Sequence, residues 1–331
     1  MKTIGNKNIP FPNPQDHNFT FIDLFAGIGG FRLAMNSVGG KCVFSSEWEP
    51  NAAKTYQKNF GELPFGDITK EETKKNIPEQ FDILCGGFPC QAFSIAGYRK
   101  GFEDSRGTLF FDIASILKKH RPKVALLENV KNLERHDNGN TFNVIIRTLE
   151  DIGYKTFSKV MNAMEYGNTP QNRERIFIVA FDPEQVPNYR NFTFPEPITL
   201  TRTIADCIID GIKDERYYYT DSTSFYPQLK QSITSKQTVY QWRRQYVREN
   251  KSNVCPTLTA NMGTGGHNVP IILTDNGIRK LTPKECLNFQ GFPQGYSFAD
   301  DITDARKYTQ AGNSVVVPLV TRVCQSIMDV L

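Results

Sequence analysis

Short apolar runs alternate with helix-like segments along residues 19–180, and this alternation limits the possible folds more than any other feature. Runs with the length of buried strands occupy residues 19–25, 42–46, 81–85, 124–127, 155–161 and 176–180. Helical patterns separate several of them, at residues 31–38, 50–59, 109–119 and 141–152. The alternation predicts an α/β fold, with a doubly wound and mostly parallel sheet that carries helices on both faces.

The pattern changes after Pro183, where several prolines mark a linker. Residues 196–277 are rich in Thr, Ser, Tyr, Gln and Gly, which indicates a smaller, irregular, β-rich domain. Helical character returns at 279–292, introduced by Thr282 and Pro283, and a last helix runs to the terminus. We therefore expect an arm at 1–17, an α/β domain at 18–195, a smaller domain at 196–277, and a hinge helix with a returning C-terminal segment at 278–331.

Composition sets looser limits. The net charge of +4 is compatible with nucleic-acid binding but does not require it. The seven cysteines are scattered, without paired metal-ligand spacing, so we expect reduced thiols and no metal site. No stretch has the length of a membrane span, and the start lacks the apolar centre of a signal peptide, so a cytoplasmic protein is expected.

A cysteine follows the apolar run at residues 81–85, within the stretch Gly86-Gly87-Phe88-Pro89-Cys90-Gln91. Two glycines and a proline predict that the chain leaves the strand for a fixed loop. Cys90 would then lie at the carboxyl edge of the sheet, where open α/β sheets bind their ligands. A lone cysteine is more often a buried packing residue. Its neighbours Pro89 and Gln91, together with a second motif downstream, favour a reactive thiol.

A glycine-rich turn at residues 26–30 separates the first strand from the first helix. It is an incomplete version of the dinucleotide fingerprint and is weak evidence alone. Glu47 lies 20 positions beyond Gly27, the separation at which such folds place an acid on ribose hydroxyls. Asp67 could accept a hydrogen bond from an adenine amino group. Taken singly, Glu47 could be a helix cap and Asp67 a turn residue. Together these features predict a nucleoside-containing cofactor.

A carboxylate, Glu128, follows the strand at 124–127 and would share one cleft with Cys90. This pair suits alkylation of a pyrimidine at C5, because a thiolate must add at C6 while an acid acts at N3. Arg173 and Arg175 could hold the ring oxygen and favour the thiolate. Considered alone, these arginines could equally form surface ion pairs with neighbours such as Glu174.

Six motifs, in order, resemble those of the DNA cytosine-5 methyltransferases, in particular the bacterial enzymes of type II restriction–modification systems. They are Phe25-Ala26-Gly27-Ile28-Gly29-Gly30, Gly87-Phe88-Pro89-Cys90-Gln91, Glu128-Asn129-Val130, Gln171-Asn172-Arg173-Glu174-Arg175, Arg279-Lys280-Leu281-Thr282-Pro283 with Gln290-Gly291-Phe292-Pro293, and Gly312-Asn313-Ser314-Val315. The resemblance implies that Cys90 is the nucleophile, that Glu128 acts at N3, and that Arg173 and Arg175 contact the flipped base or its phosphate.

The resemblance also implies S-adenosyl-L-methionine as cofactor, with S-adenosyl-L-homocysteine as product. The implied cofactor-binding residues are Phe25, Ala26, Gly27, Ile28, Gly29, Gly30, Glu47, Trp48, Asp67, Ile68, Gly87, Pro89, Leu109, Asn313, Ser314 and Val315. The substrate would be double-stranded DNA. A monomer is expected, free of membranes, in a system that can include a cognate restriction endonuclease without a stable complex.

The resemblance implies that the smaller domain reads the DNA sequence. Its interleaved basic and aromatic residues at 240–248 suit phosphate contact and base-edge readout. The solvated face of an ordinary strand would give the same pattern. The expected DNA contacts are Gln91, Ser94, Gln241, Arg243, Arg244, Thr257 and Asn261, the first two in a closing loop at 91–101. Three alternatives are less favoured. The large glycine-rich module argues against an RNA-directed relative, and the intact Cys90, Glu128 and Arg175 argue against a DNA-binding protein without catalysis. A redox protein that uses Cys85 and Cys90 fails on their spacing, which is too long for a CxxC pair.

Overall fold

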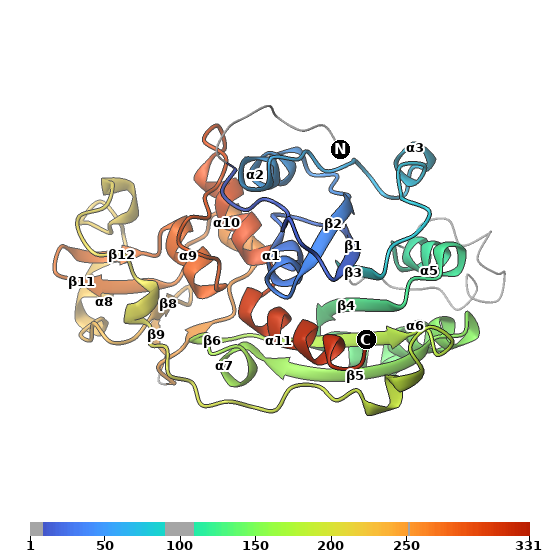
Figure 1. Cartoon of the computed structure of the whole chain (residues 1–331). Helices are drawn as coiled ribbons and strands as arrows, with labels where there is room; N and C mark the ends of the chain where they lie inside the picture. The colour runs from blue at the N-terminus through green and yellow to red at the C-terminus, as the bar shows by residue number, and fades with distance from the viewer. Residues whose placement is uncertain (1–8, 90–108, 251) are drawn as a thin grey trace. The chain divides into compact units, whose positions relative to one another are not determined.

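The structure is a computed structural model that describes residues 9–89, 109–250 and 252–331. The expected roles of Cys90, Gln91 and Ser94 therefore concern residues outside the described ranges. The chain divides into two compact units. The first contains residues 1–161, 174–196 and 320–331, and the second contains residues 162–173 and 197–319 (Figure 1).

The first unit is built on a six-stranded sheet with the order β2-β1-β3-β4-β7-β5. Its strands are β1 (Phe19–Leu24), β2 (Gly40–Ser45), β3 (Ile83–Gly87), β4 (Val124–Val130), β5 (Lys155–Asn162) and β7 (Glu174–Phe181). β1 pairs in parallel with β2 and β3, and β3 pairs in parallel with β4. β7 runs antiparallel to β4. The predicted mostly parallel α/β fold is confirmed.

Helices cover both faces of this sheet. The helical segments described in this unit are α1 (Gly30–Ser37), α2 (Pro50–Phe60), α3 (Glu71–Lys74), α5 (Leu109–His120), η1 (Lys131–Gly139), α6 (Asn140–Asp151), η2 (Pro187–Asn191) and the greater part of α11 (Val317–Met328). Ile178 of β7 packs in one apolar cluster with Ile113 of α5 and Ile145 of α6. On the opposite face, the Sγ atom of Cys324 in α11 lies 3.7 Å from the Sδ atom of Met35 in α1.

The strand β3 includes both glycines that were expected to leave it, so that part of the sequence prediction is wrong. The reason is the neighbouring strand. A Cβ atom at Gly86 would lie 2.6 Å from the backbone oxygen of Leu24 in β1, so the close approach of the two strands requires glycine. The strand therefore extends to Gly87, only three residues before Cys90.

The second unit contains two small sheets. A four-stranded sheet has the order β12-β11-β8-β9, and β10 pairs in parallel with β6. The strands are β6 (Gln171–Asn172), β8 (Tyr240–Trp242), β9 (Val247–Glu249), β10 (Cys255–Pro256), β11 (Ile271–Thr274) and β12 (Gly277–Lys280). Helical segments are α7 (Ala163–Tyr166), η3 (Ala205–Cys207), η4 (Glu215–Tyr217), α8 (Tyr226–Ser232), η5 (Ala260–Thr264), α9 (Pro283–Phe289) and α10 (Asp304–Asn313).

The unit boundaries differ in part from the expected ones. The expected boundary after residue 195 lies next to the division at Glu196. Residues 162–173, however, group with the second unit, because β6 pairs with β10. Residues 278–319 also group there, since β12 pairs with β11. Arg279 consequently lies in a strand, and the helix expected from residue 279 begins only at Pro283, after Thr282 caps it.

Among the helices that the structure describes, none combines the length and apolar character needed to span a bilayer.

Candidate active site

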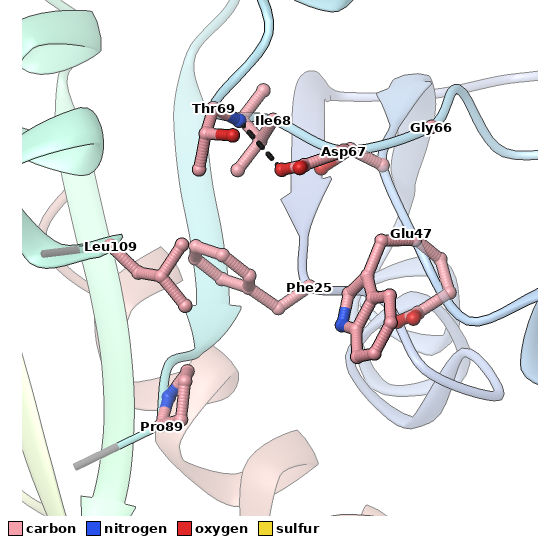
Figure 2. Close-up of a pocket in the computed structure, with 10 residues that line it drawn as sticks. Phe25, Glu47, Gly66, Asp67, Ile68, Thr69, Pro89 and Leu109 are labelled. Carbon is pink, nitrogen blue, oxygen red and sulfur yellow. Dashed lines mark hydrogen bonds between the residues drawn. The ribbon is translucent and has the colours of Figure 1, made fainter. Parts of the chain in front are cut away.

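A pocket of about 280 Å³ lies in the first unit (Figure 2). It is lined by Phe25, Ser46, Glu47, Trp48, Gly66, Asp67, Ile68, Thr69, Pro89 and Leu109. Seven of these were expected to bind the cofactor. The other three were missed, although each is a sequence neighbour of an expected residue: Ser46, Gly66 and Thr69. Five separate segments thus meet at one cavity.

The glycine-rich turn leads from β1 into α1 and follows Phe25, which lines the pocket. Phe25 has a φ of 55°, and Gly27 and Gly29 have φ values of 54° and 83°. A side chain at Gly29 would also collide with Phe60, since its Cβ would lie 2.2 Å from the ring. The turn can therefore form only with glycine at this position. Its role is to hold Phe25 in the pocket and to aim the Gly27 amide at Glu47.

Glu47 is held by two backbone amides. Its Oε2 accepts a hydrogen bond from the Gly27 nitrogen at 2.8 Å, and its Oε1 accepts one from the Glu49 nitrogen at 2.7 Å. Burial raises the pKa of the Glu47 carboxyl above its ordinary value, although both amides oppose the shift. Each carboxylate oxygen has capacity for a further donor. The group is thus oriented to accept bonds from two adjacent hydroxyls.

Asp67 forms the turn that its sequence suggested, because its Oδ1 accepts a hydrogen bond from the Thr69 nitrogen at 2.9 Å (Figure 2). Figure 2 shows Phe25, Pro89 and Leu109 on one side of the cavity, with the carboxylates of Asp67 and Glu47 on the other. Trp48 is 72% exposed. Apolar surfaces for a flat purine, one carboxylate for an amino group and another for ribose hydroxyls fit the adenosine part of S-adenosylmethionine.

Glu128 and Arg175 form the second element of the site. Glu128 is 9% exposed, and its Oε1 lies 3.0 Å from the Nε of Arg175. The pair results from the sheet, because β4 and β7 run side by side with Val130 opposite Arg175. Gly87 is opposite Glu128 on the other flank, and a Cβ there would lie 3.2 Å from Oε2. Glycine therefore leaves space beside the carboxylate.

Asn129 fixes the chain just before the expected nucleophile. Its Nδ2 donates to the Phe88 oxygen at 2.9 Å, and its Oδ1 accepts from the Val130 nitrogen at 2.8 Å. Phe88 is buried and packs against Phe110, with ring centroids 5.7 Å apart. The backbone two residues before Cys90 is consequently anchored to the strand that carries Glu128.

The six described cysteines are buried and free: Cys42, Cys85, Cys207, Cys255, Cys286 and Cys324. Burial raises the thiol pKa of Cys42 and of Cys207 to about 12 and that of Cys85 well above its usual value. Cys85, which the redox alternative required, donates its thiol hydrogen to the Ile22 oxygen at 3.3 Å. These buried thiols are therefore poor nucleophiles at neutral pH.

Arg173 lies in the second unit, is 2% exposed and binds backbone oxygens through both terminal nitrogens. Its Nη1 donates to Leu258 at 2.6 Å, and its Nη2 donates to Ser314 at 2.7 Å and to Gly312 at 3.1 Å. The expected contact with a flipped base stays a prediction. Three expected cofactor residues belong to the same unit: Asn313, Ser314 and Val315.

Six other expected cofactor residues shape the surroundings without being among the described residues that line the pocket: Ala26, Gly27, Ile28, Gly29, Gly30 and Gly87. Ala26 ties the turn to the end of β2, since its nitrogen donates to the Ser46 oxygen at 2.9 Å. These residues set the backbone path, whereas the pocket wall comes from their neighbours.

The expected DNA contacts of the second unit lie on a hairpin that includes residues 241–244 and on the segment 257–261. β8 and β9 form the hairpin, and its tip at residues 243–246 is exposed. Arg244 has a φ of 60° there, and the Arg243 nitrogen donates to the Tyr246 oxygen at 2.9 Å. Thr257 donates its hydroxyl to the Asn172 oxygen, and Asn261 is exposed.

The family model for C-5 cytosine-specific DNA methylases matches residues 19–329 of this sequence. The chain belongs to this family. A type II methyltransferase from Bacillus sp. (strain RFL6), M.Bsp6I, is 52% identical over 92% of the chain and 96% of its own length. M.HpaII of Haemophilus parainfluenzae is 44% identical, over 97% of the chain and 93% of its own length. M.HhaI of Haemophilus parahaemolyticus is 42% identical, over 96% and 97%.

Solved structures confirm the methylase fold. A mutant DNMT2 from Spodoptera frugiperda superposes with a TM-score of 0.69 at 20% identity, over 94% of this chain and all of its own. A DNA modification methyltransferase, described as putative, from an Escherichia coli prophage gives a TM-score of 0.67 at 19% identity, over 95% and 99%. Identities this low support the fold alone.

Proposed function

We propose that this cytosine-5 methylase transfers a methyl group to C5 of a cytosine in double-stranded DNA, with Cys90 as nucleophile and S-adenosylmethionine as methyl donor. The observation that carries the proposal is the Glu128–Arg175 pair. Glu128 lies directly opposite Gly87, and Gly87 ends the strand that precedes Cys90 in the sequence. The chain belongs to the methylase family. When bound, the cofactor supplies an electrophilic methyl group on a positively charged sulfur.

The protein's part in the reaction follows from these side chains. The Cys90 thiolate adds to C6 of the cytosine, while Glu128 shares a proton with N3 so that the electron pair released from the C5–C6 bond resides at C5. C5 then takes the methyl group. Loss of the C5 proton to a base restores the C5–C6 double bond and expels the Cys90 thiolate. Arg175 holds Glu128 in place and can bond the ring oxygen with its remaining N–H groups.

Base extrusion is a requirement of this chemistry, because C6 is inaccessible within a stacked duplex. The exposed hairpin tip at residues 243–246 is the element we assign to sequence reading, together with Thr257 and Asn261. Two arginines on a tight turn can reach guanine edges or phosphates. The relatives reported above carry the name type II methyltransferase, which supports a role beside a cognate restriction endonuclease.

Bisulfite sequencing tests the proposed function. Plasmid DNA of diverse sequence is incubated with the purified protein and S-adenosylmethionine, beside a Cys90→Ala variant and a Cys207→Ala control. Protected cytosines in one short recurring context are expected with the wild type and the control, and none with Cys90→Ala. If no cytosine is protected on DNA, the proposal fails, and methylation of tRNA instead would establish the RNA-directed alternative.

A further inference from the structure

Three buried polar side chains of the second unit are not used by the mechanism above. Gln171 and Gln290 are fully buried, and Arg173 is 2% exposed. Together they bind backbone atoms of segments that are far apart in sequence, and we call them the glutamine–arginine junction. Buried polar side chains need partners, and a satisfied network of them fixes one arrangement of the chain.

The junction holds Leu258 on both sides of its peptide unit. Gln171 Oε1 accepts a hydrogen bond from the Leu258 nitrogen at 3.0 Å, and Arg173 Nη1 donates to the Leu258 oxygen at 2.6 Å. Just before Leu258 in the sequence, Cys255 and Pro256 of β10 pair with Gln171 and Asn172 of β6. The backbone of Leu258 is therefore tied by side chains where no regular sheet continues.

Gln290 links this contact to a third segment. Its Oε1 accepts from Gln171 Nε2 at 3.2 Å, and its own Nε2 donates to the Ala311 oxygen at 2.7 Å. Arg173 reaches the same segment through Gly312 and Ser314. Leu258, the end of α9 and the end of α10 are thus joined by one set of bonds.

Close backbone packing adds to these bonds. A Cβ at Gly312 would lie 2.2 Å from the Thr259 carbonyl carbon, and one at Gly263 would lie 2.2 Å from the Ala305 oxygen. Thr309 Oγ1 donates to the Ala260 oxygen at 3.3 Å. The stretch at 257–264 therefore rests on α10 with no space between them, and we call it the recognition segment.

The recognition segment is fixed on one side and open on the other. Leu258 and Met262 are 1% and 4% exposed, whereas Thr259, Asn261 and Thr264 are exposed. Groups that discriminate between base edges must be held in place, because a displaced hydrogen-bond donor binds correct and incorrect bases equally weakly. Because the buried residues Leu258 and Met262 fix the backbone, the exposed polar side chains of the recognition segment are held in defined positions.

We propose that Gln171 and Gln290 are positioning residues for DNA sequence discrimination, acting through the backbone of Leu258 and the recognition segment. This inference rests on the proposed function and names the groups that set the accuracy of its site choice. Arg173, the third residue of the glutamine–arginine junction, has the same role. Its bonds to three backbone oxygens assign it to positioning rather than to direct contact with the reacting base.

The test is Gln290→Met, which keeps the side-chain length and removes the amide. The Ala311 oxygen keeps a bond from the Ser314 nitrogen, so no acceptor is left without a partner there. Asn288→Leu is the matched control, because Asn288 lies two positions before Gln290 and its side chain donates to the Cys207 oxygen at 3.0 Å, outside the junction. Its backbone bond to the Gln290 nitrogen does not depend on the side chain. Arg173→Lys, which keeps the charge but not the fork, is the second variant.

The measurement is the ratio of kcat/KM on a cognate duplex to that on a duplex with one altered base pair, beside the melting temperature. We expect Gln290→Met and Arg173→Lys to lower this ratio by about tenfold, while Asn288→Leu lowers only the melting temperature. An unchanged ratio in folded Gln290→Met and Arg173→Lys would overturn the inference, as would an equal fall in Asn288→Leu. Wild-type protein that methylates no DNA would instead refute the proposed function.

Discussion

The two units hold their functional groups in different ways. In the first, Glu47, Glu128 and Arg175 lie on or next to the strands of one sheet, and strand pairing sets their backbone positions. In the second, the recognition segment has little regular pairing, and buried side chains hold it. Sheet edges suit chemistry that is common to a family. Under the proposed function, turns held by side chains would allow the DNA recognition sequence to change without disturbing that chemistry.

The largest effect is expected at Glu128, and it should separate chemistry from recognition. Glu128→Gln removes the proton that is shared with N3 and should lower kcat by about 10²–10⁴-fold. DNA affinity should be unchanged, which a gel-shift titration checks. Glu174→Gln is the control, because that exposed carboxylate pairs with Lys131 one position before Arg175. A loss of DNA binding equal to the loss of rate would break the division of roles between the units.

The next effect concerns the cofactor. Glu47→Gln places an amide group where one oxygen now accepts from Gly27 or Glu49, so one of these backbone donors loses its partner. We expect the Kd for S-adenosylmethionine to rise about tenfold with little change in the KM for DNA. Fluorescence of the exposed Trp48 at the pocket reports this binding. An unchanged Kd would contradict the role given to Glu47.

A change at the hairpin tip should weaken DNA binding and leave cofactor binding unchanged, which is the opposite of the effect expected at Glu47. Arg244→Gly suits the positive φ at this position and removes one charge without strain. We expect the KM for DNA to rise severalfold and the logarithmic salt slope of binding to fall by about one, with S-adenosylmethionine affinity unchanged. Lys155→Ala, at an exposed lysine of β5, should leave both quantities as they are. Equal effects of the two variants would show that the hairpin has no special role.

A smaller effect, on stability alone, is expected inside the first unit. Burial raises the pKa of Asp23 from 3.8 to about 8, although Arg32 opposes the shift. Between pH 4 and pH 8 the unfolded chain therefore loses this proton while the folded protein keeps it, so stability falls as pH rises. Asp23→Asn should raise the melting temperature by a few degrees at pH 7.5 and by less at pH 5. The same increment at both pH values would contradict a protonated Asp23.

The sequence predicted the first unit well because local signals and strand order agree there. Phe25 and Glu47 follow strand ends, Asp67 lies in a turn after α2, and the three side chains line one pocket. The error at Gly86 came from a partner strand some 60 residues away, which no local pattern shows. Ser46, Gly66 and Thr69 were missed because they line the pocket as neighbours of the diagnostic residues.

The second unit was predicted only in outline. The short helix α8 was not expected, although Leu229 on it joins the core of Tyr219, Phe225 and Ile271. Its sequence is too short for a clear helical period, so tertiary packing decides its structure. The role of Arg173 depends on Leu258 and Ser314, residues 85 and 141 positions away. Such contacts are a property of the folded chain and leave no local signal.

In the proposed reaction, Cys90 adds to C6 of a cytosine whose N3 interacts with Glu128. A duplex that carries 5-fluorocytosine at the methylated position tests it, since fluorine cannot leave as the proton does and the enzyme should remain bonded to C6 after methyl transfer. We predict a denaturation-resistant adduct whose modified peptide contains Cys90, formed only with S-adenosylmethionine and absent in Cys90→Ala. An adduct at another cysteine, or none while unmodified DNA is still methylated, would contradict the account.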